Sequence, residues 1–269
     1  MEIAPGVHSI PAGVDPFMGF YAPNVYLVIA REGTLIDAGY SDNGSVSARI
    51  DYIKDIAGLR LPYIVITHAH PDHIGGAAKI KDETGAQVVL HSAEQADIAV
   101  DKAVADGDIL SLNGVRLQVI HTPGHSPGHI CIYMKEDGVL FSGDHILGIG
   151  TTAMRPPQGD MALYIDSLRK LLAYDIGMIC PGHGPPIKEA RRKLEELIQH
   201  RLEREEQVIT GLRQGKATVR ELVTDIYPEL DHRLYEAAKG QVLAHLIKLE
   251  REGKVSTTGR EEDTRYSIN

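Results

Sequence analysis

The chain has 269 residues, of which 43% are hydrophobic and 24% charged, and this composition excludes a disordered or fibrous protein. Two cysteines are too few for a disulfide framework or a cysteine-based zinc site, and no apolar run could span a bilayer, so we expect a cytoplasmic protein without a membrane partner. The net charge of −9 lies entirely in residues 1–187, with 12 Lys and Arg against 21 Asp and Glu, which disfavours a polyanionic partner for this part.

Short β-branched runs alternate with amphipathic stretches over residues 1–187, as is typical of an α/β domain. The pattern predicts strands over residues 24–30, 34–37, 63–67, 87–90, 115–120, 130–134, 139–141 and 178–180. It predicts helices over residues 45–56, 74–83, 93–100 and 161–173. The apolar, Gly- and Pro-containing segment 14–24 and residues 148–160, with Arg155, are expected to form the walls of a binding cleft.

The C-terminal third has a different pattern. A long charged helix is predicted over residues 187–212, followed by amphipathic helices over 218–226 and 234–252 and a hairpin around Gly259. Two helices followed by a two-stranded wing are typical of a winged helix. We therefore predict a catalytic domain over residues 1–187, a connecting helix over 188–215 and a winged-helix domain over 216–269.

A dense group of candidate metal ligands follows the strand predicted at residues 63–67. His68, His70, Asp72 and His73 lie within six residues. Imidazole and carboxylate groups suit Zn, Fe or Mn, and an i, i+2 spacing on an extended turn lets two side chains converge on one ion. Packing four titratable groups together without a metal would be unfavourable through desolvation and repulsion. The sequence therefore predicts a metal site here.

Three later loops each add one candidate ligand just after a predicted strand. These are His125 in TPGHSPGH, Asp144 in FSGDH and His183 in CPGHG. Glycine and proline beside each residue fix a tight turn, as a rigid site on loops requires. The ordered set of motifs resembles the metallo-β-lactamase superfamily, and the resemblance implies an α/β fold, the four-layer αββα sandwich.

The same resemblance implies a dinuclear site with two divalent ions, zinc in the first place, with Mn or Fe as alternatives. One ion would be held by three imidazoles, the other by a carboxylate and two imidazoles, and a further carboxylate would bridge them. In that order these residues are His68, His70 and His125; Asp72, His73 and His183; and Asp144. Asp72 would also be catalytic, by orienting a metal-bridging hydroxide, and Asp37 matches an acid that supports the ligands without binding metal.

The second half of the chain resembles the β-lactamase-like protein two group of that superfamily, through residues 143–148, 181–185 and 246–255. Members of this group carry a C-terminal winged helix, and the mitochondrial animal member is an endoribonuclease selective for single-stranded RNA. Two functions therefore stay open. The acidic first part favours a glyoxalase-II-like hydrolase of a small thioester or ester, and the alternative is an endoribonuclease or phosphodiesterase acting on single-stranded RNA.

Three other functions rank below these two. A β-lactamase is disfavoured because Asp144 stands where secreted β-lactamases carry cysteine. A sulfur dioxygenase would need a mononuclear iron. A metal-sensing DNA binder is disfavoured because acids match the basic residues near the helix predicted at 234–252, which favours packing or a homodimer instead.

Overall fold

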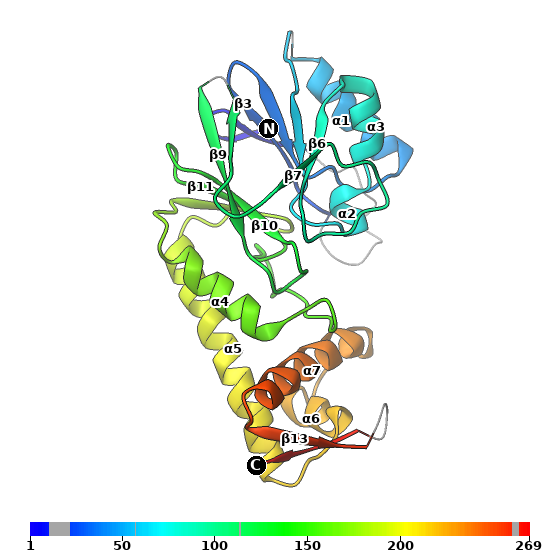
Figure 1. Ribbon diagram of the computed structural model, residues 1–269, viewed down its shortest axis with the longest axis vertical. Coiled ribbons are helices and arrows are strands. Elements are labelled where there is room, and N and C mark those ends of the chain that lie inside the picture. Colours follow the sequence, from blue (N-terminus) through cyan, green and yellow to red (C-terminus); the bar gives the residue numbers. More distant parts are fainter. Residues whose placement is uncertain (11–21, 57, 113, 260–263) are drawn as a thin grey trace. The chain divides into compact units, whose positions relative to one another are not determined.

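The structure is a computed structural model that describes residues 1–10, 22–56, 58–112, 114–259 and 264–269 (Figure 1). The chain divides into two compact units. The first unit comprises Met1–Thr122, Gly128–Thr152 and Tyr174–Ala190, and the second comprises Pro123–Pro127, Ala153–Ala173 and Arg191–Asn269. The predicted domain boundaries at residues 187 and 215 stay predictions.

The first unit contains a seven-stranded sheet whose strands follow one another in chain order. Strands β1 to β4 pair antiparallel, whereas β4 to β7 pair parallel. The bounds are β1 Glu2–Ala4, β2 Val7–Ile10, β3 Val25–Ile29, β4 Gly33–Ile36, β5 Tyr63–Val65, β6 Gln87–His91 and β7 Lys102–Val104. Because β4 and β5 run parallel, the loops that follow them leave the same edge of the sheet.

A five-stranded sheet of the same unit has the order β12-β11-β10-β9-β8. Its strands are antiparallel except for the parallel pair β11 and β12. The bounds are β8 Ile109–Leu112, β9 Val115–His121, β10 Ile130–Met134, β11 Val139–Gly143 and β12 Met178–Pro181. The loops after β11 and β12 therefore also leave one common edge.

The two sheets pack face to face through one apolar core, to which Val65 of the first sheet and Phe141 of the second belong. The other face of the seven-stranded sheet is covered by α1 Asn43–Lys54 and α3 Ala77–Thr84, as Figure 1 shows. Asp42 caps α1 by accepting a hydrogen bond from the backbone N–H of Ser45 at 2.8 Å. The first unit is thus layered as helices, sheet and sheet.

The second unit is mainly helical and ends in a hairpin. Its elements are α4 Met161–Leu171, α5 Ala190–Arg213, α6 Val219–Ile226, η2 His232–Leu234, α7 Tyr235–Arg251, β13 Val255–Thr258 and β14 Arg265–Ile268. Thr218 and Glu221 form a capping box at the start of α6. Val208 of α5, Leu222 of α6 and Leu246 of α7 share one apolar core with the hairpin. The predicted order of two helices and a hairpin is present. Among the described residues, no helix is both long enough and apolar enough to cross a membrane.

Two of the helix predictions differ from the structure, since one predicted helix is absent and another is divided into two. No helix forms over residues 93–100, because the Glu94 carboxylate instead accepts backbone hydrogen bonds from Ala69 at 3.2 Å and from Gly128 at 2.8 Å. The helix predicted over 74–83 is two helices, α2 Pro71–Ile74 and α3, interrupted at Gly75 and Gly76. The prediction also misses β1, β2, β7 and β8, since runs of three or four residues carry little period-two pattern.

Candidate metal centre

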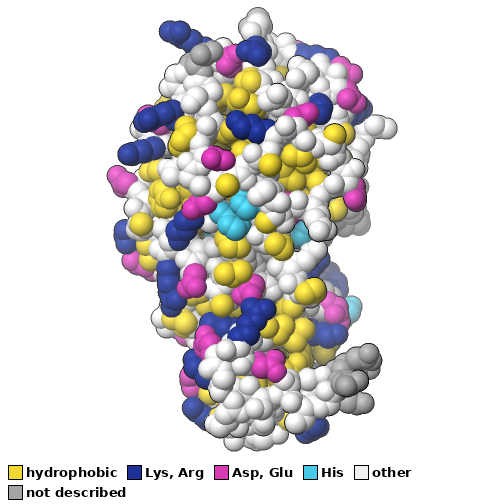
Figure 2. Space-filling model, viewed as in Figure 1, with side chains coloured by type: hydrophobic (Ala, Val, Ile, Leu, Met, Phe, Trp, Pro, Cys, Tyr) yellow, Lys and Arg dark blue, Asp and Glu magenta, His cyan; other side chains and the backbone are white. Residues whose placement is uncertain are grey.

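Six of the seven predicted ligands lie in the first unit, on loops that follow strands. The loop after β5 carries His68 and His70, the short helix α2 that follows it carries Asp72 and His73, and the loops after β11 and β12 carry one ligand each. We call this set the His–Asp cluster: His68, His70, Asp72, His73, Asp144 and His183. Figure 2 shows imidazole side chains reaching one face of the molecule.

Four side chains of the cluster bring one donor atom each to a common point. His183 Nε2 lies 3.2 Å from Asp72 Oδ2 and 3.4 Å from Asp144 Oδ1. His73 Nε2 lies 3.3 Å from Asp144 Oδ1 and 3.8 Å from Asp72 Oδ2. Two imidazoles and two carboxylates from the helix α2 and from two separate loops therefore converge.

These separations fit a metal ion. Ligand atoms of a tetrahedral ion with bonds of about 2.0–2.1 Å lie about 3.3–3.4 Å from one another, close to three of the four observed separations. The donor set of nitrogen and carboxylate oxygen suits zinc, manganese or iron. His68, His73 and Asp144 form a second group of three ligand atoms that lie within 4.8 Å of one another. Asp144 thus lies within reach of both halves of the cluster, as the predicted bridging role requires.

Asp37 orients two imidazoles of the cluster through its carboxylate, that of His73 directly and that of His68 through Thr67. His73 Nδ1 donates to Asp37 Oδ2 at 2.7 Å, and Thr67 Oγ1 donates to the same oxygen at 3.0 Å. Thr67 Oγ1 in turn lies 3.1 Å from His68 Nδ1. Because a carboxylate only accepts hydrogen bonds, this series of hydrogen bonds places a hydrogen on the Nδ1 atom of both His68 and His73. Their Nε2 atoms can therefore act as metal ligands. The supporting role predicted for Asp37 agrees with this geometry.

The local charges favour a cation. Burial opposes the charged form of His73, yet the nearby carboxylates of Asp37 and Asp144 raise its pKa well above the usual range. Burial likewise opposes ionisation of Asp72, but the imidazoles of His183 and His73 lower its pKa. Asp72 is therefore an anionic ligand at neutral pH, and a metal cation can take the place of the proton at His73 Nε2.

Two glycines allow the loops to approach this closely. A Cβ atom at Gly143 would lie 2.6 Å from Thr67 Oγ1 and 2.7 Å from His129 Nε2. At Gly182 it would lie 2.4 Å from Asp144 Oδ1. Gly182 N also donates to Gly143 O at 2.7 Å, which ties the loop of His183 to that of Asp144. The glycines beside the predicted ligands thus serve close packing of the loops.

The remaining predicted ligands are His70 and His125. His70 Nδ1 lies 2.9 Å from His68 Nε2, so these two imidazoles face each other across the i, i+2 spacing. His125 lies on the loop Pro123–Pro127 of the second unit, with its Nδ1 atom 3.0 Å from the carbonyl oxygen of Ala153. The assignment of His125 to the first metal stays a prediction.

Sequence reasoning missed several residues that support the cluster. Thr67 acts through its hydroxyl, and Glu94 ties the backbone of Ala69, between two predicted ligands, to that of Gly128. Burial and the carboxylate of Asp72 raise the pKa of Tyr40, whose phenol therefore stays neutral close to the cluster. Thr67 could have been found from its place before the His-x-His motif, but Glu94 and Tyr40 carry no local signal.

Other residues considered from the sequence fall into three groups. Cys180 is buried, and burial raises the pKa of its thiol to about 12, so it packs as an unreactive hydrophobic group. His129 and His145 are buried beside ligand loops, and His129 Nδ1 lies 2.9 Å from Thr122 Oγ1. Of the two predicted cleft walls, Arg155 is an exposed residue of the second unit, and Phe17, Met18, Phe20 and Tyr21 lie outside the described residues.

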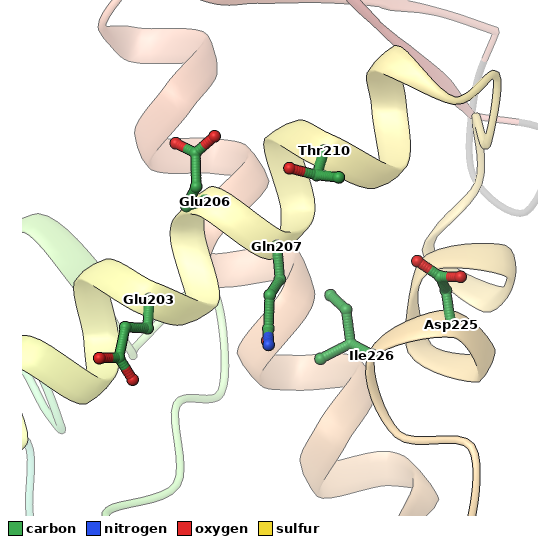
Figure 3. A pocket seen from close by; sticks show the side chains of 6 residues that line it. All are labelled: Glu203, Glu206, Gln207, Thr210, Asp225 and Ile226. Carbon is green, nitrogen blue, oxygen red and sulfur yellow. The ribbon is translucent and has the colours of Figure 1, made fainter.

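The second unit has a cavity of about 420 Å³ between α5 and α6 (Figure 3). It is lined by Glu203, Glu206, Gln207, Thr210, Asp225 and Ile226. Its acids already have partners, since Asp225 pairs with Lys216 at 3.0 Å and Glu206 with Arg213 at 3.5 Å. With neither imidazole nor thiol in this lining, the cavity offers no catalytic group comparable with the His–Asp cluster.

An α/β sandwich whose strand ends hold a His–Asp cluster of this kind defines the metallo-β-lactamase class of protein. Residues 18–183 match the family model of the metallo-beta-lactamase superfamily, and residues 218–264 match that of the beta-lactamase associated winged helix domain. The chain belongs to the metallo-β-lactamase superfamily and carries the associated C-terminal winged helix. The fold class and the family predicted from the sequence are thereby confirmed.

Relatives and solved structures agree with this assignment. The chain is 32% identical over 239 residues to a beta-lactamase-like protein 2 homolog of Caenorhabditis elegans, covering 86% of this chain and 80% of that one. It is 31% identical over 261 residues to the lactamase-like protein nscB of Arthroderma gypseum, covering 91% and 82%.

Among solved structures, a metallo-beta-lactamase family protein from Thermus thermophilus matches with a TM-score of 0.81 at 24% identity, over 100% of both chains. A beta-lactamase domain protein from Burkholderia ambifaria matches with a TM-score of 0.84 at 23% identity, over 100% of this chain and 93% of that one. Likeness at this identity shows the shared fold. Members of the superfamily are generally hydrolases that bind divalent metal ions, and this chain retains a His–Asp cluster that can hold metal.

Proposed function

We propose that this chain is a dinuclear metallohydrolase that acts on a small thioester or ester. The observation that carries the proposal is the convergence of His73, His183, Asp72 and Asp144 on one point, with Asp144 also grouped with His68. Two divalent ions, zinc in the first place, would be held by the seven predicted ligands, His125 included. Their role when bound is to supply an activated water nucleophile near neutral pH and to polarise the attacked oxygen.

Side chains of the protein bind and orient the groups of the proposed metal centre. Asp72, ionised and placed 3.2 Å from His183 Nε2, binds metal and orients the nucleophile through its carboxylate. Asp37 and Thr67 fix the imidazole tautomers, so that the ligand nitrogens do not need to reorient during turnover.

Charge supports a small substrate rather than RNA. Residues 1–187 carry all of the excess negative charge, and this field repels a polyanion. The basic residues near α7 are paired with acids: Arg233 with Asp231 at 2.6 Å, Lys239 with Glu236 at 3.7 Å, and Arg251 with Asp160. Lys248 is largely buried beside Glu205 at 2.7 Å. These cations would have to leave their partners to bind phosphates.

The second candidate is cleavage of single-stranded RNA. It is favoured by the winged-helix match at residues 218–264, because this fold can present a helix to nucleic acid. Two metal ions can also stabilise the attacking and leaving oxygens of a phosphodiester. The two candidates share the site and differ in the role of the second unit.

A parallel assay separates the candidates. Zinc-loaded protein and an Asp72→Ala variant would be offered S-lactoylglutathione, acyl-CoA thioesters, lactones, a single-stranded RNA and bis-p-nitrophenyl phosphate. We expect thioester or lactone turnover that the variant loses. RNA cleavage that the variant loses and that declines steeply with salt, without thioester turnover, would replace the first candidate by the second.

The metal count tests the dinuclear mechanism in the same preparation. Close to two ions per chain, with activity lost on chelation, is the expected result. Full activity with one iron per chain would contradict the mechanism and indicate a mononuclear oxygenase instead.

A further inference from the structure

The loop that carries His183 has little rigidity of its own. Strand β12 ends at Pro181, and His183 stands between Gly182 and Gly184, so the sequence at this point offers no helix or strand to orient the imidazole. Gly184 has a φ of +83°, which glycine adopts readily. Yet His183 Nε2 must be held within reach of two carboxylates, at 3.2 Å and 3.4 Å. Something outside the loop has to fix it.

Asn24, just before β3, bonds to this loop at three points. Its side-chain amide donates to Pro181 O at 2.9 Å and to Gly184 O at 2.8 Å, and its backbone N–H donates to Gly182 O at 2.7 Å. The preceding residue, Pro23, pairs with His183 as an isolated antiparallel bridge. The carbonyl of His183 itself accepts from Gly148 N at 2.8 Å. One half-buried side chain thus ties together the two ends of the loop, on both sides of the imidazole.

We propose that Asn24 is a positioning residue for His183: its amide holds the ligand loop in the conformation that presents Nε2 to metal. This inference rests on the proposed metal centre. Both hydrogens of the amide are used on carbonyl acceptors, so a residue of the same size without the NH₂ group cannot replace it. Partners that orient a ligand typically contribute 10- to 100-fold to metal affinity. We therefore expect a loss of that order at the His183 half of the centre.

The decisive substitution is Asn24→Asp, which keeps the side-chain size and the backbone donor but faces two carbonyl oxygens with a carboxylate. Asn24→Ser, with one shorter donor, is the second variant and covers the case in which the aspartate variant does not fold. Tyr26→Phe is the matched control, because the Tyr26 hydroxyl donates to the same Pro181 carbonyl at 2.8 Å from within the core. It reports what a lost bond to the end of β12 does to stability alone.

The measurements are Zn²⁺ affinity by competition with a chelator, the visible spectrum of the Co²⁺-substituted protein, and the melting temperature of the metal-free protein. We expect Asn24→Asp to weaken binding of one ion by about 10- to 100-fold and to change the Co²⁺ spectrum, and Asn24→Ser to show a smaller loss. Tyr26→Phe should keep wild-type affinity and spectrum even if its melting temperature falls.

His183→Ala serves as the reference for loss of the ligand itself. Wild-type affinity and spectrum in the Asn24 variants, together with weakened binding in His183→Ala, would overturn the role of Asn24 and leave the metal centre standing. Wild-type affinity in the Asn24 variants and in His183→Ala alike would overturn the metal centre and this inference with it.

Discussion

The two units use ionisable side chains in opposite ways. In the first unit, the carboxylates of Asp72 and Asp144 face imidazoles across 3.2–3.8 Å, an arrangement that leaves room for a cation among them. In the second unit, the Glu205 carboxylate of α5 faces α7, with Lys248 Nζ at 2.7 Å and His245 Nδ1 at 3.6 Å, and its charge is balanced within the protein. The contrast indicates that the ionisable groups of the first unit can bind a metal ion, whereas those of Glu205 and Lys248 in the second unit stabilise the fold.

The strongest test of this contrast removes Asp144, the carboxylate that is proposed to bridge the two metal ions. Asp144→Ala should lower kcat/KM by on the order of 10³-fold or more, because metal-assisted hydrolysis gains several kcal/mol of transition-state stabilisation from the intact centre. The metal content should fall as well. Asp137→Ala, at an exposed position in the turn before β11, is the matched control and should leave both quantities unchanged. Comparable activity in the two variants would remove Asp144 from the centre.

The corresponding test in the second unit is Glu205→Ala. Removing the Glu205 carboxylate leaves Lys248 with Glu252, at 2.8 Å, as its remaining acidic partner, and we expect the free energy of unfolding to fall by about 1.5–3 kcal/mol through the lost charged hydrogen bond. The metal content of the first unit should not change. Glu196→Ala, on the same helix but in an exposed pair with Lys193, should lower the unfolding free energy by less than about 1 kcal/mol. Equal effects in a denaturant titration would mean that Glu205 contributes no more than a surface ion pair.

A smaller effect is expected from Asp37→Asn, which acts on the cluster indirectly. An asparagine amide cannot accept from both Thr67 N and His73 Nδ1, so one of these donors loses its acceptor and the tautomer of His73 is no longer fixed. Zinc affinity should fall about 10- to 100-fold. Asp42→Asn is the control, since asparagine caps a helix as well as aspartate does. Unchanged affinity in Asp37→Asn would show that the ligands orient themselves.

Much of the candidate site could be predicted from local features of the sequence. The spacing of His68, His70, Asp72 and His73 after an apolar run was sufficient to predict a metal site, because ligand chemistry and strand ends are both local signals. The glycine- and proline-flanked loops after two later strands added Asp144 and His183, and the family resemblance supplied their roles. The parallel pair β11 and β12 brings both residues to one edge. What the sequence could not predict are contacts between distant segments.

Glu94 is the clearest example of such a contact. Its stretch has a helical pattern, but its carboxylate binds two backbone N–H groups that lie 25 and 34 residues away in the chain. Asn24 likewise bonds to a loop about 160 residues further on. Neither partner leaves a periodic trace, because a single long-range hydrogen bond imposes no repeat on the sequence.

The contribution of Glu205 to the stability of the second unit should depend on pH. Burial opposes ionisation of Glu205, but the neighbouring side chains of His245 and Lys248 lower its pKa from 4.5 to about 2. A carboxyl group whose pKa is lower in the folded state stabilises the fold above its unfolded pKa and loses this contribution as the pH falls towards the folded pKa. The stability advantage of wild type over Glu205→Gln should therefore shrink by about 1–2 kcal/mol between pH 5 and pH 3. A constant difference in urea titrations at the two pH values would contradict the lowered pKa.

The smallest effect is expected where the second unit is exposed. Arg233 and Lys239 pair with Asp231 and Glu236 at the surface, and such pairs add little to stability. If the second unit only stabilises the fold, a double Arg233→Ala, Lys239→Ala variant should have a kcat/KM for the small substrate within about twofold of wild type. Its affinity for single-stranded RNA should also lie within about twofold of wild type, a difference well below 1.4 kcal/mol, which corresponds to about tenfold. Arg116→Ala, which breaks an exposed pair with Glu136 in the first unit, is the control for loss of a surface cation.

The result that would contradict this prediction is an RNA affinity that falls in the double variant but not in the control. The salt dependence of binding should then be reduced by about one released ion for each cation removed, since phosphate contacts act through counterion release. In that case the cations of η2 and α7 would bind RNA, and the second unit would supply the RNA-binding surface that the RNA-cleaving alternative requires.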